Sequence, residues 1–360
     1  MIRFGDLLES NLTDYPRVFE EVFPKSVLQR FPIPKRLKKL SGYVDKYVIF
    51  PKYLKSRLNN SQVPFDLVHI IDHSNATYLP IISKVSSAKK LITCHDLIAI
   101  RTSLKEFSEA PPTSRSGIIL QNWILECLKY SDNFVCDSSQ TLQDLNRLVN
   151  YSKSRSEVIY LGTAKPTNNR NNFQGAETLP FDISNTSFFL HVGSASWYKN
   201  RSSVLSAFKK TKETFANQNL HLVLVGPTPQ NNETDLSMRK WIKKHDKFIH
   251  SLNNIDDKSL YLLYKNAKVL LFPSYIEGFG WPPLEASTQG CPVITTKTGA
   301  IHEILKNKAT FINPKDQISI NQSIAKILIS PPPKYPVKNI PTVQNCAISY
   351  LKLYKKIIDS

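Results

Sequence analysis

The sequence predicts an α/β protein built from two doubly wound domains. Short apolar segments that suit strands alternate with longer segments that suit helices, and this alternation indicates parallel sheets covered on both faces. The rhythm stops between Thr163 and Thr186, where Asn, Thr and Pro dominate, and then restarts. A chain of 360 residues is long enough for two such domains, each with its own core. We therefore expect a ligand crevice at the carboxyl ends of the strands, between the domains.

The first domain is expected to span residues 1–165. The first 45 residues show short helical patterns but no early apolar strand followed by a glycine turn. The apolar segments that follow predict strands at 47–50, 67–71, 91–93, 134–136 and 158–160. The clearest helical patterns between them lie at 118–130 and 141–149.

Beyond a linker at residues 166–186, a second domain is expected at 187–345. Its predicted strands are 188–192, 221–225, 248–250, 269–272, 293–295 and 311–312. Its predicted helices are 202–214, 236–244, 258–265 and 284–289. Residues 346–360 predict a C-terminal helix that packs back on the first domain.

The chain is strongly basic, with 47 Lys and Arg against 29 Asp and Glu, a formal net charge of +18. The densest run extends from Lys25 to Arg57 and holds ten Lys or Arg, opposed only by Asp45. Two interpretations remain open: a surface that binds an anionic membrane, or a solvated helix face. No nucleic-acid partner is expected, because no zinc-finger, helix-turn-helix or RNA-binding pattern accompanies the charge.

The sequence shows no apolar segment long enough to cross a membrane, and its first residues lack the apolar core of a signal peptide. We therefore predict a cytoplasmic protein, peripheral to the inner face of the membrane if the basic run binds lipid. Five cysteines are scattered through the chain without a CxxC pair, so neither a disulfide framework nor a zinc site is indicated. No metal or other cofactor is expected.

Residues 273–286, PSYIEGFGWPPLEA, hold the densest set of ligand-binding features. They follow an apolar strand pattern and precede a short helix pattern that Gly290 would end. Gly278 and Gly280 lack a Cβ, so a ligand can approach the main chain there, and the following prolines mark the entry to the helix. A strand, a glycine loop and a helix in this order predict a ligand site.

Two carboxylates, Glu277 and Glu285, flank this glycine loop. We place Glu285 in the first turn of the helix, so that both carboxylates face one pocket. Carboxylates accept hydrogen bonds from hydroxyl groups, and loop amides at a helix N-terminus favour a phosphate. The arrangement suits a sugar nucleotide.

A second loop, residues 191–200 with the sequence HVGSASWYKN, follows another predicted strand. Asn200 is a plausible N-cap of the next helix, so Lys199 would lie between a strand end and a helix N-terminus, where a diphosphate can bind. Taken alone, such a lysine is more often an ordinary surface residue. The glycine loop in the same crevice favours the binding role.

These motifs resemble the signature of the retaining nucleotide-sugar glycosyltransferase family 4, also called glycosyl transferases group 1. The resemblance rests on residues 273–286, on Val192-Gly193 followed by Lys199-Asn200, on GCPVI at 290–294 and on GAIHE at 299–303. It covers the second domain and implies the GT-B fold, in which two Rossmann-like domains face a cleft. The implied partners are a nucleotide sugar and a saccharide or lipid-linked acceptor.

The resemblance also implies roles for individual residues. Glu277 would contact the hydroxyls of the donor sugar, Glu285 the ribose and Lys199 the diphosphate, while Ser194 and the 278–280 loop (Gly278, Phe279, Gly280) would complete the donor site. In the first domain, the sequence LITCHDL at 91–97 resembles a family segment whose histidine reaches the donor sugar, so His95 joins Glu277 as a catalytic candidate. Asp72 and His73 end another strand and are candidates for the acceptor side; an ordinary loop role is an equal alternative.

The sequence departs from the family pattern in two places. The arginine usually found near the lysine is replaced by Ser194 and Tyr198 at the neighbouring positions, with Arg201 as a possible substitute. The first strand and its glycine-rich loop are not visible, so either the start lies upstream or the first domain lacks that strand. Two functions therefore stay open: a retaining hexosyltransferase of polysaccharide, lipopolysaccharide or glycolipid synthesis, and a shortened, non-catalytic relative that binds a nucleotide sugar or scaffolds an assembly. The signature leaves the donor sugar open.

Overall fold

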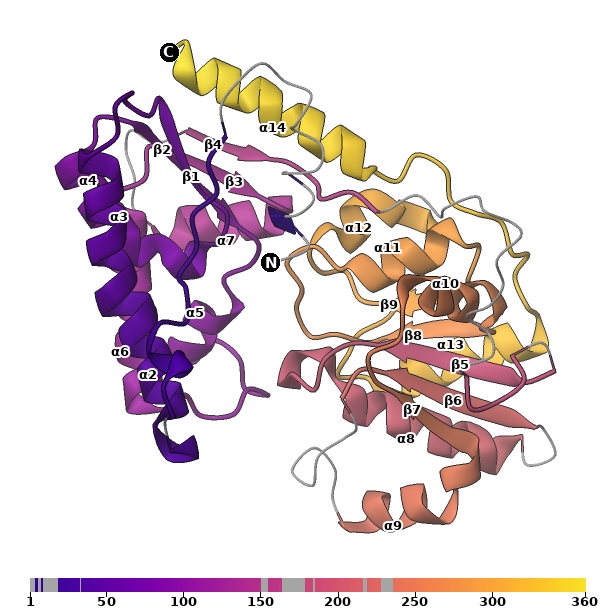
Figure 1. Ribbon diagram of the computed structural model, residues 1–360. Coiled ribbons are helices and arrows are strands. Elements are labelled where there is room, and N and C mark those ends of the chain that lie inside the picture. Colours follow the sequence, from indigo (N-terminus) through magenta and orange to yellow (C-terminus); the bar gives the residue numbers. More distant parts are fainter. Residues whose placement is uncertain are drawn as a thin grey trace.

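Two parallel α/β domains lie side by side in the computed structural model (Figure 1), as the sequence predicts. The structure describes Phe4, Gly5, Leu8 and residues 19–32, 34–149, 155–163, 179–183, 185–215, 219–227 and 236–360. The predicted linker at 166–186 lies mostly outside these residues, as does most of 1–17.

The first sheet has four described parallel strands in the order β1-β2-β3-β4. Its strands are β1 (Leu67–Ile70), β2 (Lys89–Cys94), β3 (Asn133–Cys136) and β4 (Arg155–Val158). The helices of this domain are α2 (Lys38–Val44), α3 (Phe50–Asn59), α4 (Leu79–Val85), α5 (Ile98–Ser103), α6 (Arg115–Leu128) and α7 (Ser139–Leu148).

Alternate residues of these strands enter two different cores. Ile92 and Cys94 of β2 pack with buried residues of α3, α4, α6 and α7, whereas Leu91 belongs to a second cluster on the opposite face. Because the strand order runs in one direction, right-handed crossovers leave the helices of this domain on one face. Another element must cover the second face.

That element is the C-terminal helix α14 (Val343–Ile358), which runs from the second domain across the first (Figure 1). The Tyr354 hydroxyl lies 2.7 Å from Nδ1 of His69 on β1, and the Tyr350 hydroxyl lies 2.9 Å from Oγ1 of Thr93 on β2. Burial lowers the pKa of His69 to about 3, so this histidine is neutral in the core. The helix thus joins the two domains through a buried polar network.

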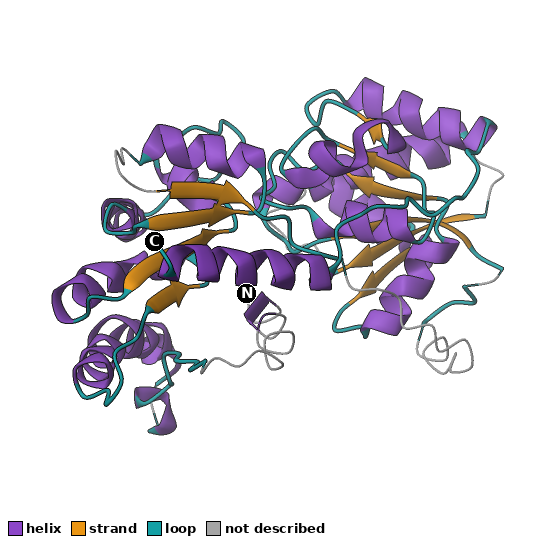
Figure 2. Cartoon of the chain, turned by 90° about the horizontal axis from the view of Figure 1, so that it is seen from above, coloured by secondary structure: helices purple, strands orange, loops and turns teal. Residues whose placement is uncertain are grey.

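The second sheet has six described strands in the order β10-β9-β8-β5-β6-β7. Helices cover both faces of the sheet (Figure 2): α8 and α13 pack on one, and α10, α11 and α12 on the other. The strands are β5 (Ser187–Val192), β6 (Leu220–Val225), β7 (Ile249–Leu252), β8 (Val269–Phe272), β9 (Val293–Thr295) and β10 (Thr310–Phe311). The helices are α8 (Arg201–Thr214), α9 (Leu236–Lys244), α10 (Asp257–Asn266), α11 (Trp281–Thr288), α12 (Ala300–Leu305) and α13 (Gln317–Ile329).

The strand order of this sheet reverses between β5 and β8, the adjacent pair from which the chain winds outward in both directions. Loops that leave two such strands diverge and open a crevice at their carboxyl ends. The loops that carry Lys199 and Glu277 follow these two strands, so the topology alone places both residues at one crevice.

One predicted strand, 47–50, is wrong. These residues form a π-helical turn, Asp45–Ile49, that continues into α3. The apolar run resembles a strand, but Phe50 and Leu54 are one helical turn apart and both are buried, so tertiary packing favours a helix. The last strand of this domain also ends earlier than predicted, at Val158.

Short 3-10 helices connect several elements. They span Leu28–Arg30, Lys35–Leu37, His73–Tyr78, Trp197–Lys199, Asp246–Phe248 and Lys306–Lys308. Within the described ranges, no helix has both the length and the apolar character needed to cross a bilayer. All five cysteines are free and buried.

Candidate functional site

The structure brings Lys199 and Glu277 together at the crevice of the second domain. Lys199 ends the 3-10 helix after β5, and its ammonium lies 2.8 and 2.9 Å from the two carboxylate oxygens of Glu277, in the loop after β8. Both side chains are largely sheltered, with exposures of 13% and 7%. An ammonium has three donors, and this ion pair uses two of them. Two residues 78 positions apart in sequence therefore form one charged centre.

Asn200 ties the two loops together. It occupies the N-cap position of α8 as predicted, but its side chain does not cap the helix. Instead, its amide donates to the carbonyl oxygens of Pro273 (3.0 Å) and Pro314 (3.1 Å). The left-handed backbone of Asn200 (φ 52°) suits asparagine and directs the side chain toward the glycine loop.

The helix after the glycine loop begins earlier than predicted. Gly280 is the N-cap of α11, with a left-handed φ of 86°, so the helix starts at Trp281 and Glu285 is its fifth residue. The predicted place of Glu285 in the first turn is therefore wrong. Glu285 is nonetheless buried, and it accepts a hydrogen bond from the Tyr264 hydroxyl at 3.0 Å. Gly290 ends this helix as expected, in left-handed geometry.

Gly278 is the point where the two domains approach each other most tightly at this loop. A Cβ at Gly278 would lie 1.8 Å from the carbonyl oxygen of His95 and 3.0 Å from the Cβ of Asp96. The missing side chain therefore makes room for the backbone of the first domain, whereas the sequence suggested room for a ligand. Next to it, the Phe279 side chain is buried in the core beside Trp281.

His95 is held inside the first domain. Its Nδ1 lies 2.7 Å from a carboxylate oxygen of Asp137, and its Nε2 lies 2.9 Å from the carbonyl oxygen of Ile71. Both acceptors demand an N–H, so the ring carries two protons. Burial opposes this charge, but the Asp137 carboxylate outweighs it and raises the pKa of His95 to about 9. Both ring nitrogens of His95 are thus occupied by partners from its own domain.

The two acceptor-side candidates are buried beside His95. Asp72 caps the 3-10 helix His73–Tyr78 by accepting from the backbone N–H (2.9 Å) and hydroxyl (2.6 Å) of Ser74. His73 is also buried, with Nδ1 at 3.3 Å from Asp72 Oδ1. Ser194, the remaining donor-site candidate, is exposed, and its hydroxyl lies 2.9 Å from that of Ser196.

Arg201, the possible substitute for the missing arginine, is buried under the second loop. Its guanidinium donates to the carbonyl oxygen of Gly193 at 2.6 Å and to that of Pro227. Its positive charge therefore stabilises the backbone of the loops after β5 and β6. Of the two cations, Lys199 rather than Arg201 lies against the loop of Glu277.

Contacts that no sequence pattern indicated connect the two domains at the opening of the cleft. The Phe107 ring of the first domain lies 5.2 Å from that of Trp197, which stacks on Tyr275 at 6.2 Å. Glu109 forms an ion pair with Lys315 nearby. Phe107 and Glu109 lie in a loop without regular patterning, so only the fold reveals their partners.

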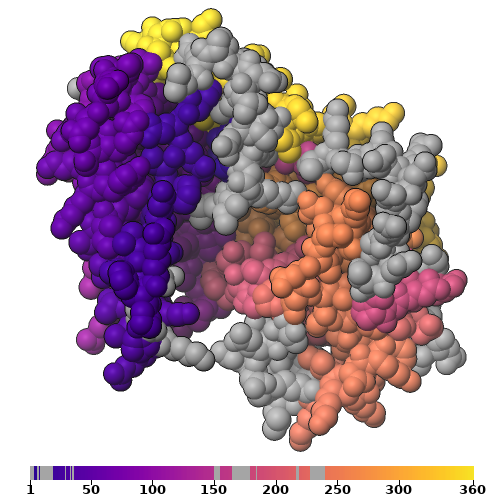
Figure 3. All heavy atoms as spheres, in the orientation of Figure 1, coloured from indigo at the N-terminus to yellow at the C-terminus, as the bar shows by residue number. Residues whose placement is uncertain are grey.

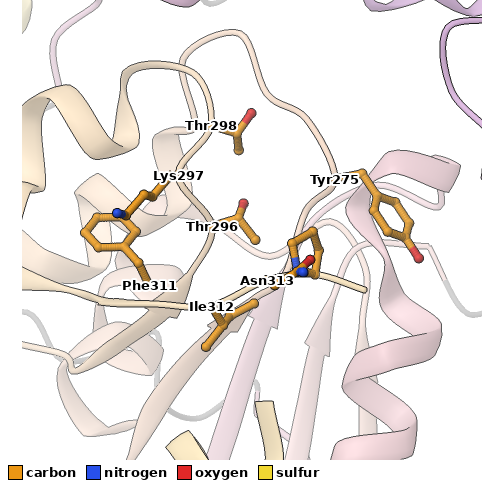
Figure 4. Close-up of a pocket in the computed structure, with 8 residues that line it drawn as sticks. Tyr275, Thr296, Lys297, Thr298, Phe311, Ile312 and Asn313 are labelled. Carbon is orange, nitrogen blue, oxygen red and sulfur yellow. The ribbon is translucent and has the colours of Figure 1, made fainter. Parts of the chain in front are cut away.

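A pocket of about 370 Å³ lies beside these contacts. Figure 4 shows Tyr275 on one side of it and Lys297 with Phe311 on the other. Thr298, which also lines the pocket, accepts a hydrogen bond from the Glu277 backbone N–H at 3.0 Å. In the space-filling view the surface is hollowed between the first domain and the second (Figure 3). Among the described residues, no group of His, Cys, Asp and Glu gathers in a way that could hold a metal ion.

Comparison with known proteins points to one family. Residues 181–340 match the profile described as glycosyl transferases group 1. The O-antigen chain mannosyltransferase RfbU of Salmonella typhimurium is 33% identical over 146 residues, 39% of this chain and 38% of RfbU. The serotype-specific mannosyltransferase WbdA of Escherichia coli is 23% identical over 259 residues, 67% of this chain and 30% of WbdA. The chain thus spans less than half the length of these two relatives.

Among solved structures, sucrose-phosphate synthase of Thermosynechococcus elongatus superposes with a TM-score of 0.72 at 18% sequence identity. The superposition covers 99% of this chain and 92% of that chain. The likeness to this structure therefore covers both domains, and their arrangement is the GT-B fold.

Proposed function

Because the chain belongs to the glycosyl transferases group 1 family through residues 181–340, we propose that it is a retaining hexosyltransferase. The donor is a nucleoside diphosphate sugar bound at the crevice of the second domain, and the acceptor is a hydroxyl of a saccharide or lipid-linked saccharide. The observation that supports this most directly is the Lys199–Glu277 pair at the strand-order reversal, where α/β sheets bind ligands.

The chemistry of this crevice suits the transfer. As the sugar leaves, negative charge grows on the diphosphate, and fixed positive groups stabilise it. The ion pair with Glu277 leaves the third N–H of Lys199 for that charge. We propose the amides of residues 278–280 as the backbone donors beside it. A diphosphate that draws Lys199 toward itself would release the Glu277 carboxylate to accept hydroxyls of the sugar. Glu285, beside Tyr264, would hold the ribose.

We propose a mannosyl group as the transferred sugar, in the synthesis of a cell-surface polysaccharide. Both RfbU and WbdA carry the name of mannosyltransferase, and the name of RfbU refers to the O-antigen chain. The paired carboxylates also fit other hexoses, so a donor panel decides the sugar.

Hydrolysis of nucleotide sugars by the purified protein tests this function. GDP-mannose, UDP-glucose, UDP-galactose and UDP-N-acetylglucosamine are incubated separately, and release of the nucleoside diphosphate is followed. A transferase hydrolyses its own donor slowly when no acceptor is present, so one donor should stand out. The alternative is a non-catalytic relative, which would bind a nucleotide sugar without any turnover. The buried Arg201 and the His95 ring, bonded within its own domain, would suit that alternative.

The basic run from Lys25 to Arg57 is proposed to hold the protein at an anionic membrane, where a lipid-linked acceptor would be presented. Its one acidic residue, Asp45, is buried and accepts from the Leu28 backbone N–H at 3.0 Å. The surface of the same segment mixes exposed cations with exposed apolar side chains. The cations are Lys25, Arg30, Arg36, Lys38, Lys39, Lys52 and Lys55. The large apolar residues include Phe31, Leu37, Leu40, Tyr43 and Tyr53.

Flotation with vesicles tests this surface. Binding to vesicles of phosphatidylglycerol and phosphatidylcholine should exceed binding to phosphatidylcholine alone and should fall when Phe31 and Leu40 are both replaced by serine. The variant Lys306→Ser with Lys308→Ser removes two exposed cations elsewhere and should bind as the parent does. Equal flotation with both vesicle types would overturn the proposal, and tight binding to duplex DNA at moderate salt would favour nucleic acid instead.

A further inference from the structure

Two motifs from different domains meet across the cleft at Glu303. This residue lies on α12, within the GAIHE segment of the second domain. Its Oε1 accepts from the Ser139 backbone N–H at 3.0 Å, and its Oε2 accepts from the Ser139 hydroxyl at 3.0 Å. Oε2 also accepts from the Tyr160 hydroxyl at 2.8 Å. All of these donors belong to the first domain.

The contact uses the N-terminus of α7, whose first residue is Ser139. The first backbone N–H groups of a helix have no partner within the helix, and the helix dipole favours a negative charge there. Ser138 satisfies one of them from within the first domain, by accepting from the Thr141 N–H at 3.1 Å. Glu303 supplies the carboxylate for the Ser139 N–H from the other domain, so this end of α7 is completed only when the two domains are together.

A second contact beside it runs in the opposite direction. Gln140 of α7 accepts a hydrogen bond from the Gly299 backbone N–H at 2.5 Å. Gly299 in turn packs on the glycine loop: a Cβ there would lie 2.6 Å from the carbonyl oxygen of Gly278 and 2.9 Å from that of Glu277. A continuous chain of contacts therefore leads from α7 of the first domain to the backbone of Glu277.

We propose that Glu303 and Gln140 form an interdomain clasp that positions the loop of Glu277 and Gly278 against the first domain. This proposal rests on the proposed function for its effect on turnover, but the clasp itself is a property of the domain arrangement. Glu303 touches none of the candidate donor-binding side chains in the described structure, so it acts as a positioning residue. Loss of the Glu303 carboxylate should change the position of the two domains relative to each other. Nucleotide binding by the second domain should remain.

An interdomain distance measurement tests the clasp without any substrate. The five native cysteines are buried, so spin labels can be directed to cysteines introduced at exposed Lys129 and Lys326, one in each domain. The parent should give a narrow distance distribution, and Glu303→Gln should broaden it or shift it. Asp256→Asn is the matched control, because the Asp256 carboxylate also accepts from a backbone N–H at a helix N-terminus, that of Ser259 on α10, but within its own domain. A distribution unchanged by Glu303→Gln would overturn the clasp.

Kinetics then test the positioning role. With GDP-mannose as the donor probe, Glu303→Gln should lower the turnover of hydrolysis about tenfold, because a charge-assisted hydrogen bond is weakened. The affinity for GDP should change less than twofold, and Gln140→Ala should act in the same direction with a smaller effect. Parent turnover in Glu303→Gln, or an equal loss of turnover and GDP affinity, would overturn this role. If the parent hydrolyses none of the nucleotide sugars, the proposed function fails, while the distance measurement still decides on the clasp.

Discussion

The two walls of the cleft are built in different ways. On the wall of the second domain, Lys199 and Glu277 come from loops after adjacent strands and pair directly with each other. On the wall of the first domain, His95 and Asp72 are hydrogen-bonded to partners of their own domain. Nδ1 of the buried His73 lies 3.3 Å from Asp72 but makes no hydrogen bond within the described residues. The second wall thus joins its two charged side chains to each other, whereas the first wall holds His95 and Asp72 in hydrogen bonds of its own domain and meets the glycine loop through the His95 backbone.

The largest effect is expected where the walls touch. Gly278→Ala places a methyl group against the backbone of His95, which cannot give way as a flexible side chain can. The domains must separate there, and a displacement of about 1 Å can lower turnover about 100-fold. Gly117→Ala is the control, since its Cβ would meet side-chain atoms of Thr113 and Ser114 and no backbone. Donor hydrolysis measured for both variants checks this; equal rates would show that the close approach has no role.

A smaller loss of turnover is expected from Glu277→Gln, about 30-fold, because hydrogen bonds to a charged acceptor are stronger than those to an amide. The substitution leaves Lys199 without its counter-charge, and this loss destabilises a sheltered pair. The double variant Lys199→Met with Glu277→Gln removes both charges and separates stability from function. Thermal unfolding should recover in the double variant while hydrolysis stays low. If the double variant also recovers hydrolysis, Lys199 and Glu277 do not take part in the reaction.

The loops and strands of the second wall could be predicted from the sequence, because the information that specifies them is local. The glycine loop, the Lys-Asn pair and the strand rhythm each lie within one short segment, and the strand-order reversal then joins them. The orientation of His95 was not predictable, since it depends on Asp137 and Ile71, which come from neighbouring strand ends. The same holds for Gly278, whose tight neighbour lies in the other domain, and for residues 47–50, where packing outweighs strand propensity.

The ion pair of His95 and Asp137 on the first wall should make the stability of the protein depend on pH. The pKa of His95 in the folded protein is about 9, above the ordinary value for histidine, so its ion pair with Asp137 stabilises the fold at neutral pH. This stabilisation, about 1.5 kcal/mol for a partly exposed ring, is lost as the pH rises through 9. Chemical unfolding at pH 7 and pH 10 should show a difference that His95→Gln abolishes. An unchanged difference in the variant would assign the slope to other groups.

The smallest effect is expected from substitution of Asp72. The same substitutions test whether Asp72 binds the acceptor. Asp72→Ala removes a helix cap and should cost about 1 kcal/mol of unfolding free energy. Asp72→Asn keeps an oxygen for the Ser74 N–H and should be close to neutral in stability. If Asp72 binds the acceptor, Asp72→Asn should raise the KM for acceptor and leave donor hydrolysis unchanged. An unchanged KM would assign Asp72 to structure alone.

We propose that one nucleoside diphosphate binds on the second wall through Lys199 and Glu285. Titration calorimetry with GDP, UDP and ADP tests it directly on the parent, on Lys199→Ala and on Glu285→Ala, with Lys306→Ala as a control for loss of an exposed cation. The structure predicts that one of the three nucleotides binds the parent and the control equally, and that both site variants weaken its binding at least about tenfold. If both site variants bind the nucleotide with the affinity of the parent, binding through Lys199 and Glu285 is contradicted.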